Sequence, residues 1–160
     1  MEIYAARSDE ANVEPLVKKL REAARKLGVF AQAFGPELIV SERHLLLAYE
    51  VSSRAFREGT NLSNNLENEV LTRAAASTRI NEAIKIIGVK DPEHFLLLTN
   101  AKGEKLKKLL ESIGASSSKP KFKPEIATVK KTFGITSEML KNYSLGDIVL
   151  EAVAMAGNEN

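Results

Sequence analysis

No apolar run in this chain is longer than five residues, and this limits what the chain can fold into. Residues 45–49 (LLLAY) form one such run, and residues 95–98 (FLLL) are nearly as long. A helix that crosses a bilayer needs about 20 consecutive apolar residues, so no segment is a candidate. Residues 1–4 (MEIY) lack the basic start and the apolar stretch of a secretory signal, so we expect none. The core must therefore come from short strands and amphipathic helices.

Turn residues and β-rich composition mark the expected strands. Residues 95–99 (FLLLT) are short, apolar and preceded by the turn Asp91-Pro92, which predicts a fully buried strand. Residues 29–34 form a second β-rich run, and residues 3–7 predict a short edge strand. We expect residues 115–124 (ASSSKPKFKP) to be a loop, because Ser, Lys and Pro dominate them.

Helices account for most of the remaining chain. Ser41, Ser63 and Ser144 are placed to cap helix starts, and Gly28 and Gly59 to end helices. Apolar residues at helical spacing predict an α+β fold with helix in excess, in which about six to eight helices cover a small mixed or antiparallel sheet. We expect one domain over residues 1–160. The predicted helices span residues 14–27, 41–58, 63–77, 78–88, 102–113, 125–133, 136–142 and 144–156.

Several kinds of chemistry lack the residues they need. The chain has no cysteine, which excludes disulfides, thiolate metal sites and a cysteine nucleophile, and which suits the cytoplasm. It has no glycine-rich phosphate loop and no nucleophile-elbow motif. His44 and His94 lie far apart in sequence, outside any metal-binding pattern. We therefore predict no metal and no cofactor, and a protein that is not an enzyme by itself.

Charge is distributed unevenly along the chain. The segment from Lys102 to Lys131 holds nine lysines and three acidic residues, a formal charge of +6, which leaves −4 for the rest of the +2 total. Such an excess can hold the phosphates of a polyanion through counterion release. The alternative is a solvated lysine surface that serves solubility.

Between Leu27 and Ile84 every basic residue is an arginine, and two of these flank a run of small residues. Arg73 and Arg79 lie on either side of residues 74–77 (AAAS), where another chain can approach the backbone closely. Small, apolar and forked basic groups together suit an unstacked nucleotide end. The alternative is a tight helix–helix contact whose arginines pair with Glu67, Glu69 and Glu82.

The last predicted helix is apolar on two sides. Leu145, Ile148, Val149, Ala152 and Ala156 form one stripe, and Leu150, Val153, Ala154 and Gly157 form another. A helix with two apolar sides is buried on both, and near the end of this chain one side can face another protein. The alternative is a helix wedged entirely into its own core.

Four segments together resemble a known family. They are SERHLLLAYEVSSRAF (41–56), GTNLSNNLENE (59–69), VLTRAAASTRINEAIKIIG (70–88) and FGITSEMLKNYSLGDIVLEAVAM (133–155). Their order resembles the kinase-binding subunit of the KEOPS complex, the family of the p53-related protein kinase-binding protein, and looks closest to its archaeal members. The resemblance covers nearly the whole chain.

The resemblance implies a non-catalytic role in making threonylcarbamoyl-adenosine in transfer RNA. The family subunit binds a kinase-like ATPase through its C-terminal helix, meets the carbamoyl-transferase subunit only within the complex, and recruits transfer RNA by its 3′ CCA end. No membrane takes part. The alternative is a protein-only regulator of a kinase-like ATPase, without RNA contact.

Site residues follow from placing these roles on the features above. The partner-binding candidates lie on the last helix, residues 144–156, and are Ile148, Val149, Ala152, Val153 and Met155. The RNA-binding candidates are Arg54, Arg57, Arg73, Ala75, Ala76, Ser77, Arg79, Ile80, Asn81 and Lys85.

Overall fold

The computed structural model describes residues 1–157, and these form two compact units that are both discontinuous in sequence. Unit 1 comprises Met1–Pro36 and Val89–Lys121. Unit 2 comprises Glu37–Gly88 and the described residues from Phe122 onward. The expectation of one domain over residues 1–160 stays a prediction, and its last three residues lie outside the described part.

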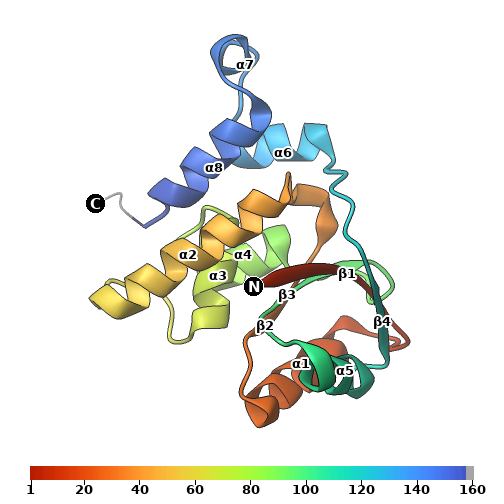
Figure 1. Cartoon of the computed structure of the whole chain (residues 1–160). Coiled ribbons are helices and arrows are strands. Elements are labelled where there is room, and N and C mark those ends of the chain that lie inside the picture. The colour runs from red at the N-terminus through yellow and green to blue at the C-terminus, as the bar shows by residue number, and fades with distance from the viewer. Residues whose placement is uncertain (158–160) are drawn as a thin grey trace. The chain divides into compact units, whose positions relative to one another are not determined.

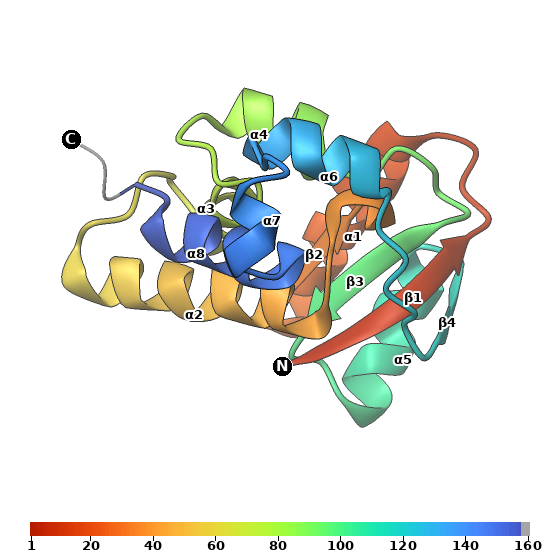
Figure 2. The ribbon, with the colours of Figure 1, turned by 90° about the horizontal axis from the view of Figure 1, so that it is seen from above.

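Unit 1 contains a four-stranded antiparallel sheet (Figures 1 and 2). Its strands lie in the order β2-β3-β1-β4. With its two helices the unit has the chain order β-α-β-β-α-β of the split β-α-β motif, and Glu37–Gly88 are inserted between the halves. The elements are β1 (Glu2–Ser8), α1 (Val13–Leu27), β2 (Ala31–Phe34), β3 (Phe95–Thr99), α5 (Gly103–Ser112) and β4 (Ala115–Ser118).

The core of unit 1 lies between the sheet and the helices α1 and α5. Leu16 and Leu20 of α1, Leu109 of α5, and Phe95 and Leu97 of β3 are buried there together. All five residues of β3 are buried, which confirms the strand predicted from its apolar run. The α+β class with helix in excess is also confirmed.

Two strand predictions in unit 1 were wrong. The strand predicted at the sheet edge is β1, an inner strand whose Ala5 pairs with Leu96 on one side and Ser118 on the other. Its second neighbour, β4, lies in the segment expected to be a loop. The serine-rich β4 has no apolar alternation of its own, so only its pairing with β1 makes it a strand.

Unit 2 is helical, and its longest helix is α2 (Glu42–Glu58). α2 packs against α3 (Leu66–Ala74) and α8 (Leu145–Met155), and α3 packs against α4 (Ile80–Ile87). Figure 1 shows α8 running alongside α2. The other elements are the 3-10 turn η1 (Pro36–Leu38), which begins at the last residue of the first segment of unit 1, and the helices α6 (Ile126–Phe133) and α7 (Met139–Asn142).

Four of the five predicted capping residues, Ser41, Ser144, Gly28 and Gly59, lie at helix ends. The Ser41 side chain accepts a hydrogen bond from the His44 amide, and Ser144 accepts one from the Asp147 amide. Gly59 ends α2 with φ 72°, a left-handed conformation that favours glycine. Ser63 was the wrong cap for α3, because the Asn65 side chain accepts from the Asn68 amide and the helix starts there.

Candidate functional site

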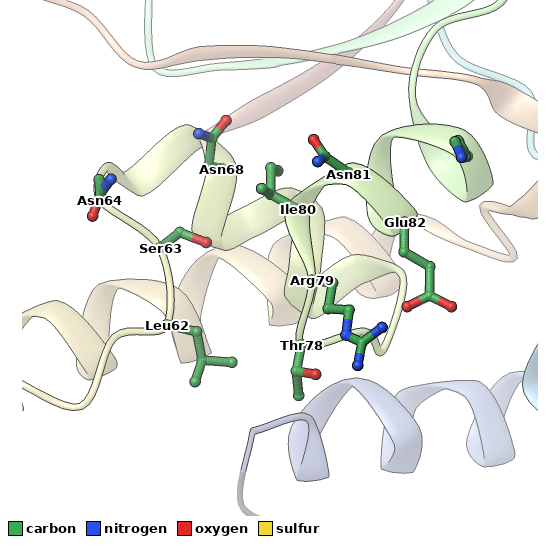
Figure 3. A pocket seen from close by; sticks show the side chains of 10 residues that line it. Leu62, Ser63, Asn64, Asn68, Thr78, Arg79, Ile80, Asn81 and Glu82 are labelled. Atoms are coloured by element: carbon green, nitrogen blue, oxygen red, sulfur yellow. The ribbon is translucent and has the colours of Figure 1, made fainter.

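A hollow with a volume of about 840 Å³ lies in unit 2. It is open to solvent and lies between the α2–α3 loop and the start of α4. In Figure 3, Leu62 and Ser63 of the loop lie across the hollow from Thr78 and Arg79. We call it the larger hollow. It is lined by Leu62, Ser63, Asn64, Asn68, Thr78, Arg79, Ile80, Asn81, Glu82 and Lys85.

A hydrogen-bonded turn shapes one side of the larger hollow. The Ser77 hydroxyl accepts from the Arg79 amide at 3.2 Å and donates to a Glu82 carboxylate oxygen at 3.2 Å. Just before it, Ala76 has φ 51°, and it is the one non-glycine residue with positive φ in the described chain. The turn therefore holds Arg79 at the N-cap of α4, with its side chain exposed.

The lining of the larger hollow suits a phosphate and a hydrogen-bonding base. Arg79 and Lys85 are exposed, and within residues 1–157 Arg79 forms no ion pair. Ile80, Asn81 and Glu82 of the first turn of α4 also line the hollow, and a helix start favours an anion. Three asparagines offer both donors and acceptors for base edges. Glu82 is the only acid in the lining and faces Ser77.

Four of the predicted RNA-binding residues come together in this hollow, namely Arg79, Ile80, Asn81 and Lys85. Sequence reasoning missed the opposite side, formed by the loop residues Leu62, Ser63 and Asn64 together with Asn68 of α3. The cluster of asparagines in residues 61–65 (NLSNN) is the signal that could have identified it, since asparagine is common both in loops and at polar binding sites.

The other RNA-binding candidates lie outside this lining. Arg54 and Arg57 are exposed on α2. Ser77 is buried and serves the turn described above. Ala75 and Ala76 line a second, smaller hollow of about 260 Å³.

Arg73 contradicts the prediction that it contacts phosphate. Its side chain is 4% exposed and pairs with Glu69, which is fully buried and one turn earlier on α3. The Arg73 Nη2 and Glu69 Oε1 atoms are 2.8 Å apart, and Arg73 Nε donates to the same oxygen at 2.9 Å. Its Nη1 donates to the carbonyl oxygen of Ala156. Because its donors are used inside the fold, Arg73 has a structural role. This agrees with the alternative in which the arginines pair with nearby glutamates in a helix–helix contact.

The smaller hollow brings α8 beside the small-residue run. Besides Ala75 and Ala76, it is lined by Thr78, Thr132, Phe133, Ala152, Met155, Ala156 and Gly157. Thr78 lines both hollows, so they are neighbours on the surface of unit 2.

Only two of the predicted partner-binding residues are available on the surface of α8. Met155 is half exposed and Ala152 partly exposed, and both line the smaller hollow. The predictions for Ile148, Val149 and Val153 were wrong, because all three are buried as α8 packs on α2 and α3. An apolar stripe reports which residues avoid water, but this stripe is covered by the chain itself.

His44 is buried in unit 2 and has both ring nitrogens engaged. Nε2 donates to the Ala74 carbonyl oxygen at 2.8 Å, and Nδ1 accepts from the Val40 amide at 3.3 Å. Burial lowers the pKa of His44 to about 4, although the hydrogen bond to Ala74 opposes this shift. In residues 1–157 no three His, Asp or Glu side chains gather as metal ligands. His44 is thus a neutral core residue.

Comparison with known proteins gives the family of the chain. Residues 9–157 match the profile of the family described as kinase binding protein CGI-121. The chain belongs to this family. Its members are described by binding a kinase rather than by a reaction, which agrees with the predicted kinase-binding role. A search of curated proteins found no match. Within the described residues, no helix has the length and apolar character to cross a membrane.

Proposed function

We propose that this CGI-121 family protein is the non-catalytic, kinase-binding subunit of an archaeal-type KEOPS complex in the cytoplasm. It binds the kinase-like ATPase subunit directly and meets the carbamoyl-transferase subunit within the complex. It recruits the transfer RNA that receives threonylcarbamoyl-adenosine by holding the 3′ CCA end. The family match supports the kinase partner, and the RNA role rests on the larger hollow.

The observation that carries the RNA role is the chemistry of the larger hollow. Its volume of about 840 Å³ lies in the range of small-molecule sites and accommodates nucleotide-sized groups. Arg79 and Lys85 supply positive charge for phosphates, while the asparagines supply hydrogen bonds for bases. Because the hollow is open and of nucleotide size, a single-stranded end suits it best.

A second basic surface supports contact with a longer RNA. The exposed lysines of α5 and of the residue before it (Lys102, Lys105, Lys107 and Lys108) lie on a helix that packs beside α1. Helix α1 also carries five exposed basic residues, of which Lys19 pairs with Glu10. They are Lys18, Lys19, Arg21, Arg25 and Lys26. Such a surface holds phosphates without reading sequence.

One side of α8 lines the smaller hollow and is partly exposed. Met155 and Ala152 present apolar groups there, next to Ala75 and Ala76. An exposed methionine beside small residues can accept an apolar side chain of a partner, because its unbranched chain adapts its shape. We therefore propose that the kinase-like subunit contacts α8 through this side, and not through Val149 or Val153.

Binding of transfer RNA with and without its 3′ CCA end tests the proposal. Intact transfer RNA should bind in a salt-sensitive manner, and trimming the CCA end should weaken binding strongly. Equal affinity for both RNAs would contradict recruitment by the CCA end. The protein-only alternative predicts binding to the kinase-like subunit and no RNA affinity above that of an unrelated protein of equal charge.

A further inference from the structure

The buried pair Glu69–Arg73 holds more than its own helix. Glu69 Oε1 accepts from Arg73, and its other oxygen, Oε2, accepts from the backbone amides of Leu62 at 2.9 Å and Ser63 at 2.7 Å. Leu62 and Ser63 line the larger hollow. The carboxylate therefore fixes the backbone of one side of that hollow.

The other end of the pair reaches the end of α8. Arg73 Nη1 donates to the carbonyl oxygen of Ala156, the residue that follows the last turn of α8. Carbonyls at a helix end lack partners within the helix and carry partial negative charge, so a guanidinium suits this place. Met155, next to Ala156, lines the smaller hollow.

Gly157, which follows α8, lies close to both Leu62 and Arg73. Its φ is +81°, and a Cβ there would lie 2.8 Å from Leu62 Cδ1 and 3.1 Å from Arg73 Nη1. The chain after α8 thus passes directly against the loop residue and the guanidinium. A side chain at this position would displace one of them.

These contacts form one continuous connection from the larger hollow to the end of α8. We propose that Glu69 and Arg73 are positioning residues that couple the two proposed binding surfaces, so that RNA in the larger hollow and a protein partner on α8 strengthen each other's binding. The last turn of α8 cannot separate from Arg73, nor the loop from Glu69, without leaving part of a buried ion pair unsatisfied. A ligand that orders either surface therefore orders the other. The coupling rests on the proposed function for its ligands, but the connection itself is present in the free protein.

Hydrogen exchange of the free, full-length protein tests the connection without any ligand. Arg73→Met removes the hydrogen-bond donors and leaves an unbranched apolar side chain. Lys141→Met is the matched control, because it removes one positive charge from an exposed position on α7. Arg73→Met should speed exchange at the Leu62 and Ser63 amides and in the last turn of α8 by about tenfold or more, beyond any change in the core amides of α2. Lys141→Met should change neither region. Faster exchange in only one region, or equally throughout the protein, would overturn the inference.

Gly157→Ala provides a second variant in case Arg73→Met folds poorly. It keeps both residues of the ion pair and adds a methyl group against Leu62 and Arg73. Its effect should extend from the end of α8, through Arg73 and Glu69, to the Ser63 amide. An effect confined to residues next to Gly157 would contradict the coupling.

Adding RNA separates this inference from the proposed function. In the wild-type protein, a transfer RNA transcript ending in CCA should slow exchange in the last turn of α8 by about fivefold or more, and Arg73→Met should abolish this slowing even at saturating RNA. RNA binding without slower exchange at α8 would refute the coupling and leave the proposed function standing. If no RNA binds, the proposed function fails, and the ligand-free comparison alone decides whether the connection exists.

Discussion

The imidazole Nε2 of His44 donates a hydrogen bond to the carbonyl oxygen of Ala74 across 2.8 Å, which ties the start of α2 to the end of α3. A carbonyl only accepts, and the Val40 amide only donates to Nδ1, so the ring is neutral with its proton on Nε2. Protonation of Nδ1 would remove the acceptor for Val40 and place a charge in the core. The histidine thus links packing at the centre of unit 2 to pH.

We predict that folding stability falls as the pH drops from about 6.5 toward 4. The pKa of His44 is about 4 in the folded protein, below its ordinary value of 6.5, so the unfolded chain takes up the proton first as the solution becomes acidic. The contribution of neutral His44 to the free energy of unfolding is fully present above pH 6.5. It is lost progressively down to about pH 4 and amounts to about 3 kcal/mol.

Urea unfolding at several pH values measures this effect. His44→Gln should remove most of the loss between pH 6.5 and 4, whereas His94→Gln should leave it unchanged because His94 is exposed. If both variants keep the wild-type pH dependence, other groups cause it and the assignment to His44 is wrong.

Arg79→Glu should weaken transfer RNA binding by about tenfold or more and lower the salt dependence of binding by about one phosphate contact. The side chain is exposed at the larger hollow, so the fold should persist. Lys141→Glu makes the same charge change on α7 and serves as the control. Fluorescence anisotropy with labelled RNA measures both affinities. Equal weakening by the two variants would mean that net charge, and not the hollow, determines binding.

Substitutions of Val153 and Met155, two residues apart on α8, should differ in their effects on stability and on partner binding. Val153 is fully buried, so Val153→Glu places an unpaired carboxylate in the core and should destabilise the protein by about 3 kcal/mol or more. Met155 is 50% exposed, so Met155→Glu should leave the melting temperature nearly unchanged and abolish binding of the kinase-like partner. Thermal unfolding and co-purification with the partner distinguish the two. A stable Met155→Glu protein that still binds its partner would move the interface elsewhere.

Ala76→Gly should stabilise the protein by up to about 1 kcal/mol, because a left-handed conformation strains a residue with a Cβ and glycine adopts it freely. Ala76→Val should destabilise it, since a branched side chain tolerates φ 51° least. Chemical denaturation of the three proteins gives the order. A glycine variant less stable than wild type would show that the added freedom of the unfolded chain outweighs the relief of strain.

Local patterns in the sequence were sufficient for most elements. The buried strand β3, the helix starts at Ser41 and Ser144 and the helix end at Gly59 all follow from interactions within a few residues. Such features depend on backbone conformation and on side-chain spacing, which neighbouring residues determine. The α+β class follows from their order along the chain.

Contacts between residues far apart in the chain could not be predicted from local sequence patterns. β4 is a strand because β1 pairs with it, although its own serines favour a loop. The lysine-rich helix α5 packs beside α1, which lies about 80 residues earlier in the chain. Both depend on which elements become neighbours, and spacing along one element contains no information about that.

By itself, the sequence determined where most strands and helices form, that Arg79, Ile80, Asn81 and Lys85 belong together, and that α8 is apolar on more than one side. Only the tertiary structure decided that Arg73 is buried against Glu69, that Val153 is core, and that Met155 is exposed. The reason is physical: whether a charge or an apolar group meets water depends on the elements packed around it, and those elements come from distant parts of the chain.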